Sequence, residues 1–569
     1  MKTQALLPLL GLWAAAASAR SPQAGPLLQR LHGFKEAPAE PRAESAPDQA
    51  IRARSEQHKY PRFLNSKTAQ FVVNGSGIPE VDFDVGESYA GQLPISDHAK
   101  ERDHLYFWFF PTANKEHRHK KEIVIWLNGG PGCSSLLGFL QENGPFLWPA
   151  GTLKPQRNPW SWHLLTNVVW VEQPVTVGFS QGNATARDED DIARQFLGFW
   201  KNFIRTFSMQ GYKVYVAAES YGGYYGPYIS SHMIDAKDHQ HFNLGGLLVY
   251  DGIMFNDMVQ SNVIAEAFVE QHHDVMPLDD GIRAQIRNIS ASCGFADHHR
   301  RFLTYPPAGP QPRVPPGTRE LADGSWETRS ECDGLFNLVF SEMRLINPCF
   351  NIYNVPDHCP EVYDPIGRLR PYFDRADVKK AINAPAGVQW SQCVNGVFVG
   401  PGDRSAPPDK YELPNVVDRT GNVILAHGSM DFILPLNGVL LGLQNMTWGG
   451  RRGFQTRPSD PFYVPRYGFT GARPDGRPFY GQNLPAASGV LGTTHHERGL
   501  SLVVTHLAGH EGPGYSAASA FRHLEKLVGR VRSMSETTPF TLPELRNITQ
   551  VKRPLGRGTV RIPCLQRGC

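Results

Sequence analysis

One stretch near the middle of the chain constrains the fold most: residues 213–227, KVYVAAESYGGYYGP. Its first residues predict a short buried strand, the small residues that follow predict a tight turn, and the tyrosine-rich remainder predicts a helix. Ser220 lies at the apex, where a strand-to-helix turn pushes a hydroxyl out of the sheet toward the first N–H groups of the helix. Ala218 and Gly222 are small, as a close crossing of strand and helix requires. The turn indicates a nucleophile, and the alternative is an ordinary loop serine in a glycine-rich turn.

Composition narrows the possible classes of protein. A chain of 569 residues with 41% hydrophobic and 11% aromatic residues can bury a large core, which predicts one catalytic domain with a sizeable insertion. The net charge of +3, without a long basic stretch interleaved with aromatics, argues against nucleic-acid binding. The eight cysteines include no CxxC pair and no His/Cys metal spacing, so we expect disulfides, no metal and no organic cofactor.

The ends of the chain indicate export. Residues 1–19 resemble a signal peptide, with Lys2, an apolar run and a small-residue cleavage site. Residues 20–65 are predicted to be a mobile arm or propeptide, and residues 536–569 a C-terminal tail without a lipid anchor. No other stretch predicts a membrane span. We expect a secreted, extracellular protein, or alternatively a vacuolar one, and the oligomeric state stays open. Five sequons are candidate glycosylation sites, namely Asn74, Asn183, Asn288, Asn445 and Asn547.

The order of strands and helices predicts an α/β fold. Strands expected at 88–95, 104–111, 123–128, 167–174, 244–250, 422–426 and 500–504 alternate with helices near 191–207 and 374–383. This order favours a mainly parallel central sheet flanked by helices. Residues 261–370 interrupt this alternation of strands and helices and hold four cysteines. We therefore interpret them as a disulfide-stapled cap over the edge of the sheet that carries the active site. The core would then comprise residues 66–260 and 371–535.

Three more loops follow predicted strands. NGGPGCSS (128–135) exposes backbone N–H groups, as an oxyanion hole does, although a tight structural turn is the alternative. HGSMD (427–431) ends in Asp431, and AGHEGPG carries His510. Serine, acid and histidine in this order along the chain are typical of α/β-hydrolases. The rivals of His510 are His506, His495 and His496.

Four motifs together resemble those of the serine carboxypeptidases: WLNGGPGCSS, AESYGGYYGPY, the loop ending in Asp431, and AGHEGP. This family comprises acid-acting exopeptidases of the α/β-hydrolase fold. The resemblance runs from about residue 85 to 530 and is strongest to fungal members, including the carboxypeptidase S1 type. It implies that peptide and protein C-termini are the substrates, and that a Ser-His-Asp triad cleaves them through an acyl-enzyme at acid pH.

The resemblance also implies the role of each residue. Ser220 would be the nucleophile, His510 the general base and later acid, and Asp431 the orienting acid. The N–H groups of Gly130 and Tyr221 would hold the oxyanion. The residues that would bind the substrate's terminal carboxylate are Trp126, Asn128, Gly129, Glu142 and Glu219. Two glutamates beside a substrate carboxylate must share a proton, which explains a preference for acid pH.

Some features depart from the family pattern or have more than one interpretation. Glu511 would line the pocket for the departing residue and could favour Lys or Arg, or it could be protonated and neutral. Thr176 replaces a usual glycine, and Ser429 replaces a usual aspartate. The resemblance implies a Cys133–Cys393 disulfide. The four cap cysteines allow three pairings, and the partners of Cys564 and Cys569, which could pair with each other, stay open. An esterase or acyltransferase on this scaffold, or an inactive binding glycoprotein, are the alternative functions.

Overall fold

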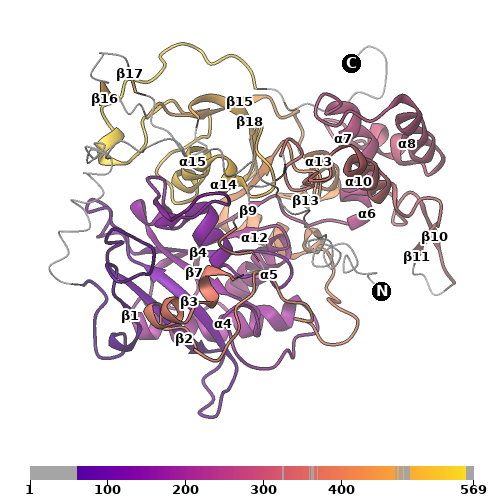
Figure 1. The fold of residues 1–569 in the computed structure, drawn as a ribbon. Helices are drawn as coiled ribbons and strands as arrows, with labels where there is room; N and C mark the ends of the chain where they lie inside the picture. Colours follow the sequence, from indigo (N-terminus) through magenta and orange to yellow (C-terminus); the bar gives the residue numbers. More distant parts are fainter. Residues whose placement is uncertain are drawn as a thin grey trace, which may run out of the picture.

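The computed structural model describes residues 61–322, 326–357, 359, 364–367, 370–467, 471–472, 478–479, 487–558 and 560. Their centre is one eleven-stranded sheet (Figure 1). Across the sheet the strands are β1 (Val72–Val73), β2 (Ser88–Pro94), β3 (His104–Phe110), β7 (Asn167–Glu172), β4 (Glu122–Leu127), β8 (Lys213–Glu219), β9 (Asn243–Tyr250), β12 (Val423–Gly428), β19 (Leu500–Thr505), β18 (Gly489–Glu497) and β15 (Asp460–Val464). Two-stranded ribbons lie outside it, namely β5 (Phe146–Leu147) with β6 (Gln156–Arg157), β10 (Thr318–Glu320) with β11 (Trp326–Thr328), β13 (Thr447–Trp448) with β14 (Arg451–Arg452), and β16 (Gly471–Ala472) with β17 (Pro478–Phe479).

The middle of the sheet is parallel, from β7 through β4, β8, β9 and β12 to β19. Both margins are antiparallel, with β1, β2 and β3 on one side and β18 and β15 on the other. The predicted α/β fold with a mainly parallel centre is confirmed. Because the parallel strands all end at one edge, the loops that follow them gather there.

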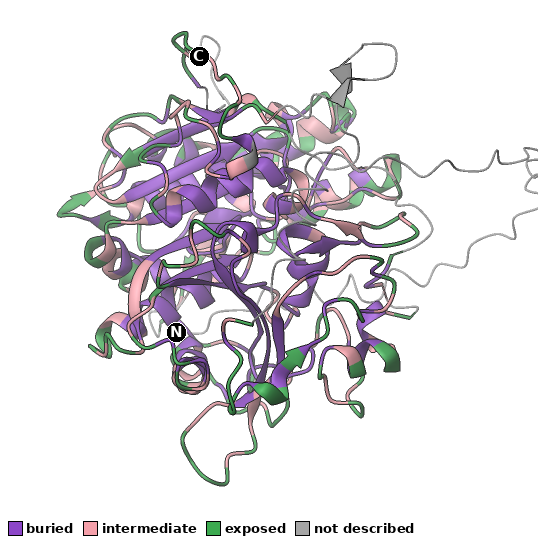
Figure 2. Ribbon diagram, turned by 90° about the vertical axis from the view of Figure 1, so that its left-hand side faces the viewer, coloured by how far each residue is buried: buried purple, intermediate pink, exposed green. Residues whose placement is uncertain are grey.

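Strand β3 shows why the sheet is covered on both faces. Successive side chains of a strand point to opposite faces, and Phe107 and Phe109 join one hydrophobic cluster while Tyr106, Trp108 and Phe110 join the other. All five are fully buried. Figure 2 shows the same pattern across the molecule, with buried strands at the centre and exposed residues in the outer loops. A strand that is apolar on both faces requires helices on each side.

The helices meet this requirement. Helix α4 buries an apolar stripe at helical spacing, Ile192, Phe196, Phe199 and Phe203, against the face that contains Phe107. It packs beside α5, which in turn packs against α12, while α15 packs on the opposite face. The α-helices are α3 (Leu136–Gly138), α4 (Glu189–Phe207), α5 (Gly222–Asp235), α6 (Asp257–Gln260), α7 (Ala265–Gln271), α8 (Asp280–Ser292), α9 (Phe295–Phe302), α10 (Leu335–Ile346), α11 (Ala376–Ala381), α12 (Glu412–Thr420), α13 (Leu436–Asn445), α14 (Gly512–Tyr515) and α15 (Ala517–Leu527).

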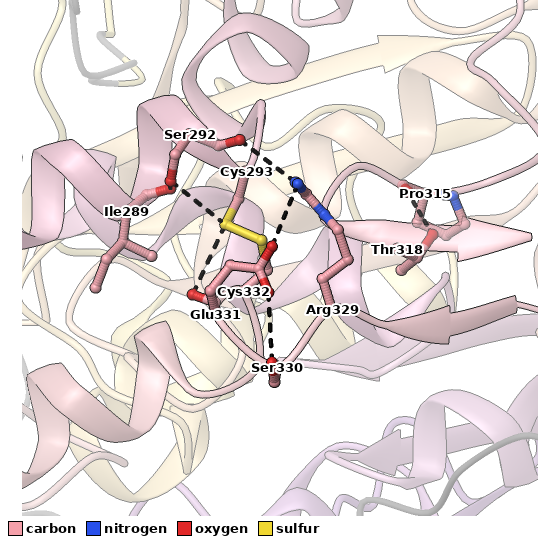
Figure 3. Close-up of a disulfide and its surroundings, with 9 residues drawn as sticks. All are labelled: Ile289, Ser292, Cys293, Pro315, Thr318, Arg329, Ser330, Glu331 and Cys332. Atoms are coloured by element: carbon pink, nitrogen blue, oxygen red, sulfur yellow. Dashed lines mark hydrogen bonds and ion pairs between the residues drawn. A yellow bond between two sulfur atoms is a disulfide. The ribbon is translucent and has the colours of Figure 1, made fainter.

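Helices α7, α8 and α10 form a separate group at the upper right of Figure 1. They belong to the segment predicted as a cap, and the structure pairs its cysteines as Cys293–Cys332 and Cys349–Cys359. Figure 3 shows the first disulfide, which joins the end of α8 to the segment before α10. The guanidinium of Arg329 lies beside it and donates to the carbonyl of Ser292 at 3.4 Å. One of the three possible pairings is therefore assigned.

Some predicted boundaries differ from those of the structure. The strand expected at 167–174 ends at Glu172, and the helix expected near 374–383 spans Ala376–Ala381. His427 and Gly428 were expected to begin a loop, but they belong to β12 because they pair with Val504 and Thr505 of β19. The signal peptide, most of the N-terminal arm, Cys564 and Cys569 lie outside the described residues. Among the described residues, no helix combines the length and hydropathy that a membrane span needs.

Candidate active site

The turn that carries Ser220 is tightly held by its backbone. Ser220 has a φ of 62° between the end of β8 at Glu219 and the start of α5 at Gly222. Its N–H donates to the carbonyl of Tyr250 at 3.0 Å, and its carbonyl accepts from Ile253 at 3.1 Å. A left-handed conformation is uncommon for a non-glycine residue and is typical of functional turns. A Cβ on Gly222 would lie 2.8 Å from the Cβ of Ala218, so the small residues allow the crossing.

The loop after β4 lies directly against this turn. A Cβ on Gly129 would come within 2.4 Å of the Tyr221 nitrogen and 2.8 Å of the Ser220 Cβ, so only glycine fits there. Gly130 has a φ of 116°, which also favours glycine. The Cys133–Cys393 disulfide fastens the loop to a distant segment of the chain. Gly130 and Tyr221, the predicted oxyanion-hole residues, thus belong to two loops in contact beside Ser220.

Asp431 and His510 come together at the same edge of the sheet. The Nδ1 atom of His510 lies 2.8 Å from Oδ2 of Asp431, and both side chains are buried. The other oxygen of Asp431 accepts from the N–H of Leu434 at 3.1 Å. The N–H of His510 donates to the carbonyl of Tyr353 at 2.7 Å, and the ring of Tyr353 stands edge-on to the imidazole. Nε2 of His510 is buried without a hydrogen-bond partner among the described residues, so a proton acceptor is available.

The rival histidines have other partners. Nε2 of His495 lies 2.9 Å from Oε1 of Glu497, and Nδ1 of His496 lies 2.9 Å from Oγ of Ser501. His506 is exposed, and its N–H donates to the carbonyl of Leu491. In contrast to His510, these contacts do not bring any of the three histidines to Asp431.

The residues predicted to bind a terminal carboxylate form a connected set. Oδ1 of Asn128 accepts from Nε1 of Trp126 at 2.7 Å and from the N–H of Gly138 at 3.0 Å. These contacts fix the orientation of the amide, whose Nδ2 donates to Glu142 at 3.2 Å and to Glu219 at 3.1 Å. Trp126 therefore positions Asn128, and Asn128 holds two buried glutamates together.

Glu142 and Glu219 are buried carboxyl groups, and one oxygen of each has no donor among the described residues. Burial raises the pKa of Glu142 to about 7, although hydrogen bonds from Glu219 and Asn128 oppose the shift. Burial and then the neighbouring Glu142 raise the pKa of Glu219 well above its usual value. Two carboxylates this close cannot both ionise without strong repulsion, so the pair retains a proton below neutral pH.

Glu511 joins this acidic group from the loop that carries His510. Burial, and next the charge of Glu142, raises the pKa of Glu511 to about 7. The two glutamates meet around Gly514, where a Cβ would lie 3.6 Å from Cγ of Glu142 and 3.9 Å from Cβ of Glu511. Glu511 is therefore largely neutral at mildly acid pH and becomes negatively charged above neutrality.

The two departures from the family pattern have local explanations. Thr176 has a φ of 86°, a conformation that explains why glycine is usual there. Ser429 hydrogen-bonds the loop of His510, because its Oγ accepts from the N–H of Leu507 at 3.0 Å. Ser429 therefore connects the loop that carries Asp431 to the loop that carries His510.

The sequence analysis missed two buried acids. Asp251 directly follows β9 and lies beside Asp431 and His510. Its place after a parallel strand was the signal that could have identified it, since Asn128, Ser220 and Asp431 follow other parallel strands. Glu172, the last residue of β7, accepts from Ser134 in the loop after β4 and from Nε1 of Trp390. No sequence signal distinguished it from an ordinary strand residue.

Known proteins resemble this chain over most of its length. A family model described as serine carboxypeptidase matches residues 79–530. A probable serine carboxypeptidase of Arthroderma benhamiae is 42% identical, covering 83% of this chain and 89% of the relative. The serine-type carboxypeptidase F of Aspergillus niger is 40% identical, covering 82% and 88%. The crystal structure of Kex1(delta)p, a prohormone-processing carboxypeptidase of Saccharomyces cerevisiae, covers 83% of this chain and 99% of its own with a TM-score of 0.62. Its 20% identity supports the fold alone.

Proposed function

Because this chain belongs to the serine carboxypeptidase family, we propose that Ser220, His510 and Asp431 catalyse its reaction. It is a serine-type exopeptidase, a hydrolase that acts on peptides. The observation that carries the assignment is the 2.8 Å contact of His510 with Asp431 at the sheet edge where the Ser220 turn also lies. Asp431 fixes the imidazole so that the second nitrogen can accept a proton.

The proposed reaction has two halves. Ser220 Oγ attacks the carbonyl of the last peptide bond while Nε2 of His510 takes the hydroxyl proton. The same proton passes to the departing amino group, the C–N bond breaks, and an acyl-serine remains. Water then attacks the acyl-serine while His510 removes a proton from it. The bond between the acyl carbon and Ser220 Oγ breaks, the proton passes from His510 to that oxygen, and the peptide leaves as a free acid. The N–H groups of Gly130 and Tyr221 would stabilise the oxyanion in both halves.

Exopeptidase specificity would come from the set around Asn128. A C-terminal carboxylate placed against Glu142 and Glu219 is tolerated only if at least one of them is protonated. The raised pKa values of both glutamates support this, because a proton is then available below about pH 7. The protonated acid would donate to the substrate carboxylate, as would the amide of Asn128. We therefore propose optimal peptide cleavage at mildly acid pH.

Glu511 would contact the departing residue. Because its pKa of about 7 leaves it largely neutral at mildly acid pH, a departing Leu or Phe would be accepted there. As the pH rises and Glu511 ionises, a departing Lys or Arg would gain an ion pair. Glu511 would thus be neutral at mildly acid pH and would favour Lys or Arg at higher pH, so the two alternatives from the sequence would each apply in one pH range.

Secretion and glycosylation also belong to this proposal. Four sequon asparagines, Asn74, Asn183, Asn288 and Asn547, are exposed and would accept glycans. Asn445 is half-buried, and its Oδ1 accepts from the N–H of Gln311 at 3.0 Å, so we propose that it is modified least. Peptide mass spectrometry after glycosidase treatment would identify the sites used.

A blocked dipeptide and its C-terminal amide, compared at pH 5 and pH 7.5, test the proposed carboxylate recognition. The free acid should be cleaved far faster at pH 5, and this advantage should shrink at pH 7.5 as the glutamate pair ionises. Equal rates for acid and amide at both pH values would refute the carboxylate site and would favour an esterase or acyltransferase specificity. A Ser220→Ala variant serves as the background control.

A further inference from the structure

Asp251 lies at an unusual position beside the proposed triad. It follows the last residue of β9, has a φ of 43° and is fully buried. An aspartate adopts this left-handed conformation more readily than most residues, but the conformation still costs free energy. Burying an acid costs more unless hydrogen bonds compensate for the lost water. The left-handed backbone and the buried carboxyl group of Asp251 therefore both require compensating interactions.

Asp251 contacts the segment that leads to Asp431. Its Oδ1 accepts from the N–H of Gly428 at 2.8 Å, at the end of β12. One polar side-chain atom from each of Asp251, Asp431 and His510 lies within 4.8 Å of the other two. Asp251 and Asp431 therefore follow two neighbouring parallel strands, β9 and β12, and Asp251 lies close to both Asp431 and His510.

Among the described neighbours of Asp251, no cation would balance the two negative charges that Asp251 and Asp431 would carry if both were ionised. The groups that face Asp251 are Asp431, His510, His427, Glu142, Glu219 and Tyr250. Nε2 of His427 lies 3.4 Å from Oδ1 of Asp251, but burial lowers the pKa of His427 to about 4, so this imidazole is neutral at mildly acid pH. His510 must also be neutral whenever it acts as a base.

Two ionised carboxylates cannot form a hydrogen bond with each other, because neither carries a donor. Oδ2 of Asp251 is buried, and no described donor group reaches it. Burial, and then the charge of Asp431, raises the pKa of Asp251 well above its usual value. A proton on Asp251 would let its carboxyl group donate a hydrogen bond to the carboxyl group of Asp431.

We propose that Asp251 is a positioning residue whose neutral carboxyl group donates a hydrogen bond to Asp431 and holds that carboxylate toward Nδ1 of His510. The proposal rests on the assignment of Ser220, His510 and Asp431 made above. Asp251 would touch neither substrate nor oxyanion, so it would act through Asp431 alone. Its ionisation would place a second negative charge beside Asp431 and loosen the contact with His510.

Two substitutions of Asp251 test whether its side chain acts as a hydrogen-bond donor or only fills space in the core. Asp251→Asn keeps the size, the donor and a side chain that tolerates left-handed φ, but it cannot ionise. Asp251→Gly suits the backbone and removes the donor. Asp257→Asn is the matched control, because burial also raises the pKa of Asp257, to about 6, while Asp257 belongs to α6 and its backbone carbonyl accepts from Oγ of Ser261 at 2.8 Å.

The measurements are kcat and KM against pH for an ester substrate without a C-terminal carboxylate, which avoids the titration of Glu142 and Glu219. Asp251→Gly should lower kcat about 10- to 100-fold with little change in KM, as expected when a catalytic group is misplaced. Asp251→Asn should retain most of kcat at pH 5 to 6 and should extend activity to higher pH by about one unit or more. Asp257→Asn should leave the pH profile unchanged.

Two results would overturn the proposal. One is an Asp251→Asn enzyme that folds normally but loses kcat tenfold or more at pH 5, or whose alkaline limb does not move. The other is an Asp251→Gly enzyme with unchanged kcat. If the glycine variant does not fold, the asparagine variant alone decides. Labelling of Ser220 in the unmodified enzyme by a serine-directed probe tests the triad separately, so the two failures are distinguishable.

Discussion

Nδ1 of His510 lies 2.8 Å from Oδ2 of Asp431, although 79 positions separate the two residues along the chain. Both side chains are buried, and each is held from a second side. The N–H of Leu434 donates to Asp431, and Tyr353 accepts from the N–H of His510. The imidazole is therefore oriented before any substrate arrives, which is the condition for efficient proton transfer.

The first prediction concerns this contact. Asp431→Asn should lower kcat by about 10⁴-fold with little change in KM, because the amide no longer favours the tautomer with the proton on Nδ1. Steady-state kinetics on a blocked dipeptide measure both constants. Ser429→Ala is the control in the same loop and should cost far less, since the substitution removes a hydroxyl that accepts from the N–H of Leu507 and, among the described residues, forms no hydrogen bond with the imidazole of His510. Similar losses for the two variants would count against a role for Asp431.

The second prediction concerns the paired glutamates. Below about pH 7 the pair holds a proton, because burial raises the pKa of Glu142 to about 7 and that of Glu219 well above its usual value. As the pH rises through this range the proton is lost and repulsion of the substrate carboxylate grows. KM for a free-acid peptide should therefore rise above pH 7, while KM for an ester should stay flat.

Glu142→Gln checks this assignment, because a glutamine cannot ionise. In this variant KM for the free-acid peptide should depend less on pH than in the unmodified enzyme, with the ester again as reference. Parallel KM curves for the two enzymes, measured on the same peptide, would remove Glu142 from the account.

The third prediction concerns Glu511. At pH 8 the charged carboxylate should favour release of C-terminal Arg over Leu more than it does at pH 5, where burial keeps the group largely neutral with a pKa of about 7. Glu511→Met should abolish this pH-dependent change in preference. Release rates for peptides ending in Arg, Leu and Phe give the ranking, and an unchanged ranking in the variant would show that Glu511 does not contact the departing residue.

The fourth prediction concerns stability. Burial raises the pKa of Glu172 from 4.5 to about 7, against the hydrogen bonds from Ser134, Phe179 and Trp390. Between these two values the folded state binds more protons than the unfolded state, so the free energy of unfolding falls as pH rises. The full shift corresponds to about 3 kcal/mol, present below pH 4.5 and lost above pH 7. Glu172→Gln should flatten the decline in chemical denaturation between pH 5 and 8.

Glu497→Gln is the matched control for that slope. Partial burial is outweighed there by hydrogen bonds from Gln455 and His495, which lower the pKa of Glu497 to about 2. Its contribution is lost only as the pH falls below about 4.5, so this substitution should shift stability without changing the slope between pH 5 and 8. Equal slopes in the Glu172→Gln variant and the unmodified chain would contradict the prediction.

Much of the site could be predicted because of where its residues stand relative to the strands. Asn128, Ser220 and Asp431 follow β4, β8 and β12, and parallel strands bring such loops to one edge. Glycines forced by close contact, as at Gly129, leave a recognisable motif in the sequence. The motif and the strand order together were sufficient to predict the fold.

The remainder depends on packing between distant segments. Asp251 is buried close to Asp431, and Glu172 contacts Ser134 and Trp390. Neither residue belongs to a motif, and because most acidic residues are exposed, nothing in the sequence indicated that these two are buried. The pairing of Cys349 with Cys359 likewise follows from the path of the chain. Such relationships need three-dimensional coordinates.

The most direct test of the account is covalent labelling by a fluorophosphonate, followed by peptide mass spectrometry. The account predicts one adduct, on Ser220, with labelling slowed at least a hundredfold in His510→Ala and abolished, together with peptide cleavage, in Ser220→Ala. An adduct on another serine, or an Ser220→Ala enzyme that still releases C-terminal residues, would contradict it.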